Sequence, residues 1–122
     1  MPLTKGLRDE ENERIQNILK RLISLDYVPE NWKISIEDLL KELALNAQGL
    51  LDLSSDDLIV HLQKLNFDWN NAEQFADFLI VLYKKSGEAN LNEKAIAVYN
   101  YIQSESKVFS FDIFNKIASA KI

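Results

Sequence analysis

Cysteine is absent from this chain of 122 residues, and glycine and proline are scarce, with three and two residues. The absence of cysteine excludes disulfide bonds, zinc sites built on thiolates and cysteine nucleophiles. Small secreted domains usually depend on such cross-links, so the composition favours a reducing, cytoplasmic location. The glycines, at positions 6, 49 and 87, are also too widely spaced to form a phosphate-binding loop.

Long apolar runs are missing as well. The longest, Phe78–Tyr83, is far shorter than the roughly twenty residues that cross a bilayer. The first residues contain no apolar signal-peptide segment, and they turn acidic from Asp9, where a transit peptide stays basic. We therefore expect neither a membrane span nor a targeting segment.

Basic residues are scarce in the middle of the chain. Residues 34–80 contain two basic and nine acidic side chains, and the whole chain carries a net charge of −5. No run of lysine or arginine is longer than two residues, so the chain lacks the basic stretch that displaces counterions from a nucleic acid. Nucleic acid is therefore not an expected partner.

The chain does contain an ordinary globular balance, with 47% apolar and 27% charged residues. Its length predicts a single domain over residues 1–122, with residues 1–8 flexible. Apolar residues recur three and four positions apart, as on one face of a helix. In the first predicted helix, Asp9–Leu25, these residues are Ile15, Ile18, Leu19, Leu22 and Ile23. The pattern predicts an all-α fold, a compact bundle of about six short helices.

Helix boundaries are indicated by capping residues and glycines. Four polar residues are predicted to cap helix starts: Ser35, Ser54, Asn70 and Ser110. Asp38 and Glu73 each follow a predicted cap by three residues, the spacing of a capping box. Gly49 and Gly87 lie where the helical periodicity fades, so both are expected to end helices in the left-handed conformation.

The second predicted helix has a core stripe that reaches Ala44 and Ala47, and Ile34 is expected to pack against Leu39 as a hydrophobic staple. Its start resembles a later segment, residues 53–59, which has the same order of an apolar residue, a serine, two acids and two apolar residues. A tandem repeat is one explanation. We favour two independent helix starts with the same capping solution, because nothing else along the two segments matches.

The helix predicted over residues 71–85 is the most apolar. From Phe75 to Tyr83 nearly every residue is apolar, which leaves almost no polar face on a helix. Such a helix must be buried on several sides, so we place it at the centre of the bundle.

Residues 71–102 resemble a tetratricopeptide-type helical hairpin. The stretch Asn71–Phe78 through Gly87 is similar to the first helix of such a repeat, and Lys94–Tyr99 through Ile102 is similar to the second. The resemblance covers about a quarter of the chain, and the alternative is an ordinary helical hairpin. It implies a helical scaffold that binds a partner, and it brings no catalytic residue with it.

The last segment, Val108–Ile122, allows two interpretations at its start. Phe109–Ile113 alternates with the period of a strand, but Ser110 can cap a helix in which Phe109 and Phe114 form the staple. We predict a helix, with a core stripe of Phe111, Phe114, Ile117 and Ala118.

His61 is the only histidine, and Asp57 lies one helical turn before it. A carboxylate and an imidazole on one face supply two ligands, and a zinc or di-iron centre needs three or more. We therefore expect His61 to be a surface or half-buried helical residue. The sequence predicts no catalytic, metal-binding or cofactor-binding residue and no enzyme.

Aromatic residues offer the best candidates for contact with a partner, because Trp and Tyr dominate the energetics of interfaces. We select Trp32, Trp69 and Tyr101, and expect the last two to be partly exposed. The predicted function is a non-enzymatic domain for protein–protein interaction, with another protein or a second copy as partner. The alternative is a bundle that binds a small apolar ligand or has weak enzyme activity through His61 and nearby carboxylates.

Overall fold

The computed structural model describes residues 5–25, 30–107 and 110–121, and of residues 5–9 it describes only the backbone. The described residues form helices and contain no strand, which confirms the all-α prediction. Within these described ranges seven helices follow one another: α1 Lys5–Ser24, α2 Trp32–Lys41, α3 Ala47–Asp52, α4 Ser55–Lys64, α5 Trp69–Ser86, α6 Ala89–Ser106 and α7 Phe111–Ala120. None of these helices is long and apolar enough to cross a membrane.

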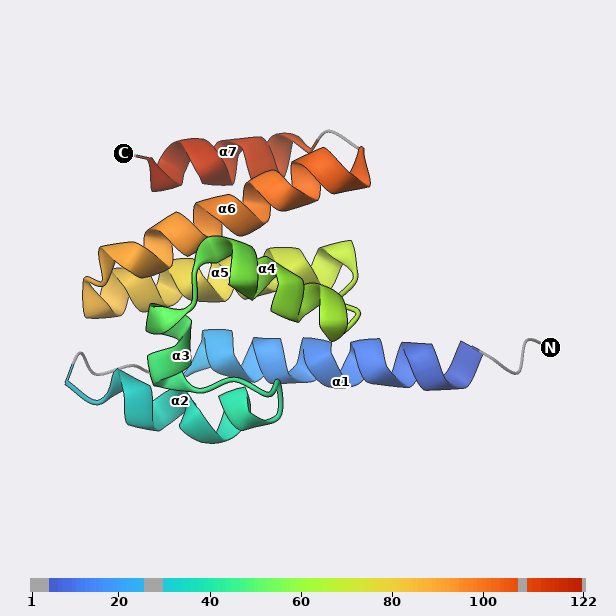
Figure 1. Cartoon of the computed structure of the whole chain (residues 1–122), viewed down its shortest axis with the longest axis horizontal. Helices are drawn as coiled ribbons and strands as arrows, with labels where there is room; N and C mark the ends of the chain where they lie inside the picture. Colours follow the sequence, from blue (N-terminus) through green and yellow to red (C-terminus); the bar gives the residue numbers. More distant parts are fainter. Residues whose placement is uncertain (1–4, 26–29, 108–109, 122) are drawn as a thin grey trace.

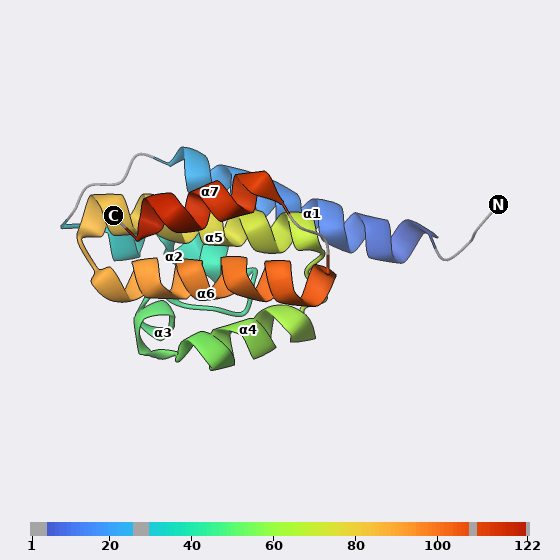
Figure 2. The same cartoon turned by 90° about the horizontal axis from the view of Figure 1, so that it is seen from above.

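The antiparallel pair α5 and α6 occupies the middle of the bundle (Figures 1 and 2). Helices α1 and α2 contact α5, whereas α7, α4 and α3 contact α6. Helix α5, which was predicted to be central, therefore lies at the centre of the bundle together with α6. It buries these residues: Asn71, Ala72, Phe75, Ala76, Phe78, Leu79 and Leu82.

Helix α1 presents its predicted apolar stripe to the core. Ile15, Ile18, Leu19 and Leu22 are buried, and Ile23 is partly buried. The helix begins at Lys5 and not at Asp9, so residues 5–8 of the predicted flexible segment 1–8 are helical. Residues 1–4 lie outside the described part of the chain.

The second predicted helix is wrong at both ends. It begins at Trp32, because Trp32, Ile36, Leu39 and Leu40 make one continuous buried stripe from that point. Ser35 therefore lies inside α2, where its hydroxyl donates to the Asn31 carbonyl. Ile34 faces solvent with 78% of its surface exposed, so the predicted staple with Leu39 does not form.

The other end of this predicted helix breaks at Ala44, which has a left-handed φ of 55° and is exposed. The break turns both Leu43 and Leu45 into the core, where a continuous helix would direct them to different faces. Asn46 then caps the short helix α3, which the sequence analysis did not predict. The described residues consequently form seven helices, where about six were expected.

Gly49 does not end a helix, contrary to the prediction. Its N–H donates to the Asn46 side chain over 2.6 Å, inside the first turn of α3. A Cβ atom at this position would lie 3.0 Å from the Asn46 Oδ1 atom, so the glycine makes room for the cap. Gly87 behaves as predicted: it ends α5 with a φ of 76°, and its N–H donates to the Tyr83 carbonyl.

The remaining predicted caps are partly confirmed. Ser54 and Ser110 accept hydrogen bonds from Asp57 N and Ile113 N. The predicted cap Asn70 is wrong, because Asp68 accepts from Asn71 N over 2.7 Å and starts α5 earlier. A carboxylate at that position also suits the positive end of the helix dipole.

The final segment is helical from Phe111, so the interpretation as a strand fails over residues 111–120. Its predicted core stripe is wrong at three of its four residues, because Phe111 and Phe114 are 74% and 52% exposed and Ala118 is exposed as well. Ile113 is buried in their place, and Ile117 packs partly against the core. Residues 108 and 109 lie outside the described part, and with them the predicted staple of Phe109.

Candidate functional site

Two of the three aromatic residues selected from the sequence lie against each other. Trp69 begins α5 and Tyr101 lies near the end of α6, and their ring centroids are 5.6 Å apart. Trp69 is 42% exposed and Tyr101 is half-buried, as predicted. The antiparallel packing of α5 on α6 brings the start of one helix beside the end of the other (Figure 1).

Helix α4 extends this pair into a surface. Its Gln63 amide donates to the Tyr101 hydroxyl over 3.4 Å, and Val60, one turn earlier on α4, is 44% exposed. We call Val60, Gln63, Trp69 and Tyr101 the aromatic face. It is built from three helices, so it exists only in the folded chain.

The surroundings of the aromatic face are acidic. Four exposed acids lie within about one helical turn of its members along the chain: Asp56, Asp57, Asp68 and Glu105. Lys64, also exposed, is the base one turn after Val60. The face therefore combines an aromatic centre with a predominantly negative rim.

Trp32 does not join this surface. It is only 5% exposed and packs in the core cluster as the first residue of α2. Its place on the buried stripe of α2 turns the indole inward. A residue with so little accessible surface offers no contact area in this fold.

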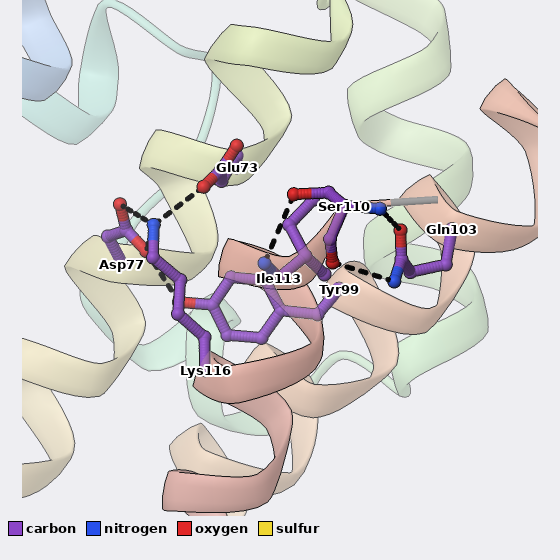
Figure 3. A network of polar contacts seen from close by, with 7 residues as sticks. All are labelled: Glu73, Asp77, Tyr99, Gln103, Ser110, Ile113 and Lys116. Atoms are coloured by element: carbon purple, nitrogen blue, oxygen red, sulfur yellow. Dashed lines mark hydrogen bonds and ion pairs between the residues drawn. The ribbon is translucent and has the colours of Figure 1, made fainter. Parts of the chain in front are cut away.

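A polar network joins α5, α6 and α7 at another part of the molecule (Figure 3). Lys116 of α7 lies 2.6 Å from Glu73 Oε2 and 3.0 Å from Asp77 Oδ1, both on α5. The Tyr99 hydroxyl of α6 donates to the same Asp77 carboxylate over 2.5 Å. Glu73 was predicted to belong to a capping box, and nothing in the sequence indicated a contact with Lys116.

The network shifts the acidity of two of its members. Burial of the Tyr99 phenol, together with its hydrogen bond to Asp77, raises the pKa of Tyr99 above its ordinary value. Burial disfavours the charged form of Lys116, but its hydrogen bonds to Glu73 and Asp77 outweigh this, so the pKa of Lys116 is raised. The lysine therefore stays cationic and the phenol stays neutral at physiological pH.

Beside this network a groove of about 370 Å³ opens between α5, α6 and α7. Asp77, Tyr99 and Lys116 form part of its wall. The groove shares no residue with the aromatic face, so the molecule has two separate candidate sites.

His61 has a structural contact. Its Nε2 atom lies 2.9 Å from the Leu43 carbonyl, which ties α4 to the turn after α2. Because a carbonyl only accepts, Nε2 carries the proton in this contact. The residue is half-buried, as predicted. Among the described residues, no three His, Asp or Glu side chains gather closely enough to hold a metal ion.

Lys94 is a buried cation that the sequence analysis did not single out. It is 4% exposed, and its ammonium donates to Asn90 and to the Leu51 carbonyl in the last turn of α3. Burial lowers the pKa of Lys94. Its position at the negative end of α3 explains why a lysine is tolerated inside the bundle.

Comparison of the chain with protein-family models, with curated proteins and with solved structures finds no match.

Proposed function

We propose that this chain is a non-enzymatic interaction domain that binds a basic segment of another protein through the aromatic face. The observation that carries the proposal is the contact of the exposed Trp69 with Tyr101 on a surface shared by three helices. Rings that already pack against each other lose little conformational freedom when a partner covers them. Such aromatic pairs are typical anchors of protein interfaces.

Charge selects the kind of partner. The acids around the aromatic face attract lysine and arginine side chains, and they repel an acidic surface. A second copy of this chain carries the same acids and the same net charge of −5, so self-association is the less favourable choice. The proposed partner is therefore a foreign segment with basic residues beside an apolar anchor. The tetratricopeptide-like character of the α5–α6 hairpin stays a prediction, and the proposal does not depend on it.

The test compares two tagged variants of the whole chain in pull-downs from the native lysate. Trp69→Ala removes the anchor, whereas Ile34→Ala truncates an apolar residue that is 78% exposed on α2, away from the aromatic face. We expect wild type and Ile34→Ala to capture the same basic protein, with capture weakening as salt rises, and Trp69→Ala to lose it.

The proposal would be contradicted if Trp69→Ala still captured this protein. It would also be contradicted if wild type captured no protein that Trp69→Ala fails to capture. Light scattering on the pure protein gives a second decision. If wild type is a dimer and Trp69→Ala is a monomer, the aromatic face binds a second copy of the chain. That result would overturn the proposal of a basic partner.

A further inference from the structure

The groove between α5, α6 and α7 has the dimensions of a small-ligand site. Its volume of about 370 Å³ lies within the range of roughly 300–1,000 Å³ that such sites occupy. The apolar part of the groove wall is formed by Ile80 and Tyr83 of α5 and by Ala120 of α7. The groove therefore suits a small apolar body more than a helix of a partner protein.

One cation in the groove wall forms no ion pair with a described residue. Asp77, Lys84 and Lys116 are the charged residues in its wall. Lys116 forms ion pairs with two carboxylates, Asp77 in the wall and Glu73 outside it, so its charge is already neutralised. No carboxylate among the described residues forms an ion pair with Lys84. The Lys84 ammonium is thus the charge that a ligand can neutralise.

The wall also holds a hydrogen-bond acceptor that no described residue uses. The Asn92 amide nitrogen donates to the Ala120 carbonyl over 2.9 Å, which fixes the orientation of the amide. Its oxygen atom, Oδ1, is buried and has no hydrogen-bond partner among the described residues. A buried acceptor without a donor is unfavourable. Asn92 as a whole is only half-buried in the groove wall, so a small shift of its amide would bring Oδ1 within reach of an N–H or O–H group on a ligand.

We propose that this groove binds a small amphipathic anion with an apolar body, one carboxylate or sulfonate, and an N–H or O–H donor. The body lies over Ile80 and Tyr83, the anion meets Lys84, and the donor serves Asn92. The proposed site shares no residue with the aromatic face. The proposal concerns binding alone and includes no chemical reaction.

Anilinonaphthalene sulfonate is a suitable probe, because it joins aromatic rings, a sulfonate and an N–H group in one molecule. Its fluorescence is titrated with the folded full-length chain, and amide chemical shifts map where it binds. We expect one saturable site per chain, with shifts concentrated in α5 after Asp77, at the start of α6 and in the second half of α7.

Matched variants separate the groove from other surfaces. Lys84→Gln removes the cation, and its neighbour Lys85→Gln removes an exposed lysine outside the groove wall. Ser119→Trp places a large side chain at an exposed position of the wall, and Ala118→Trp places it one residue away. We expect Lys84→Gln and Ser119→Trp to weaken probe binding roughly tenfold or more, and the two controls to change it less than threefold.

Circular dichroism and urea unfolding establish that each variant is folded before binding is compared. Three results would overturn the proposal. The first is no saturable binding up to about 1 mM probe. The second is affinity that Ser119→Trp and Lys84→Gln leave unchanged. The third is binding that Trp69→Ala abolishes, which would move the probe to the aromatic face.

Discussion

The Trp69 ring at the start of α5 and the Tyr101 ring near the end of α6 pack at a centroid separation of 5.6 Å, inclined by 60°. The two residues are distant in sequence, and the antiparallel α5–α6 hairpin brings them together. Because Trp69 remains 42% exposed, this contact stabilises the hairpin and also leaves an aromatic surface open to a partner.

The contact between these rings is measurable as a coupling free energy. A double-mutant cycle with Trp69→Ala and Tyr101→Ala, followed by urea unfolding, should give about 0.5–1.5 kcal/mol, the range for aromatic pairs. Tyr101→Phe is the control, since it keeps the ring and loses only the hydrogen bond from Gln63. Strict additivity of the two alanine variants would show that the rings do not interact.

The central position of α5 predicts a large cavity effect at Phe78. This side chain is fully buried and packs against the Phe75 ring at 5.9 Å. Phe78→Ala should lower the free energy of unfolding by about 3–5 kcal/mol, because neighbouring helices enclose the space that it leaves. Ile34→Ala, at an exposed position, should stay within about 0.5 kcal/mol. Equal losses in the free energy of unfolding for the two variants would show that Phe78 and its helix α5 do not lie in the core.

The start of α5 can be located by removing one cap at a time. Asp68→Ala eliminates the oxygen that accepts from Asn71 N, and it should cost about 1 kcal/mol in urea unfolding. Asn70→Ala, which alters the cap expected from the sequence, should have an effect within about 0.5 kcal/mol. A larger loss of stability in Asn70→Ala than in Asp68→Ala would show that Asn70 is the cap, as the sequence predicted.

The ion pairs of Lys116 hold α7 against α5. Lys116→Gln removes the charge that faces Glu73 and Asp77, and it should cost about 1 kcal/mol, since the lysine is 36% exposed and solvent screens the pair. Hydrogen exchange should accelerate more in α7 than in α5. Lys121→Gln, an exposed lysine after α7, provides the comparison and should leave exchange unchanged.

Tyr99 makes the free energy of unfolding depend on pH in the alkaline range. Its pKa is raised in the folded chain, so above about pH 10 the unfolded phenol loses its proton while the folded phenol keeps it. The free energy of unfolding should therefore fall as pH rises, by at most about 1.4 kcal/mol per pH unit for this group.

The measurement is urea unfolding between about pH 9 and 11, taken as the difference between wild type and Tyr99→Phe. The difference cancels the contributions of lysines that titrate in the same range. A loss in Tyr99→Phe that is equal to or steeper than the loss in wild type would mean that the pKa of Tyr99 is not raised.

Local patterns determined a good part of this fold. The stripe of α1, the caps Ser54 and Ser110, and the helix end at Gly87 all follow from interactions within one or two turns, so the sequence is sufficient to place them. The exposure of Trp69 was predictable for the same reason, since it stands next to a helix start.

Features that depend on two distant segments were decided only by the tertiary structure. Helix α2 begins at Trp32 because the burial of this side chain outweighs a serine cap. The chain breaks at Ala44, and the break allows both Leu43 and Leu45 to enter the core. The contact of Lys116 with Asp77 and the groove beside it required α7 to pack across α6. Periodicity specifies which face of a helix is apolar, but the choice of neighbour depends on how the faces fit, and this geometry exists only when the whole chain has folded.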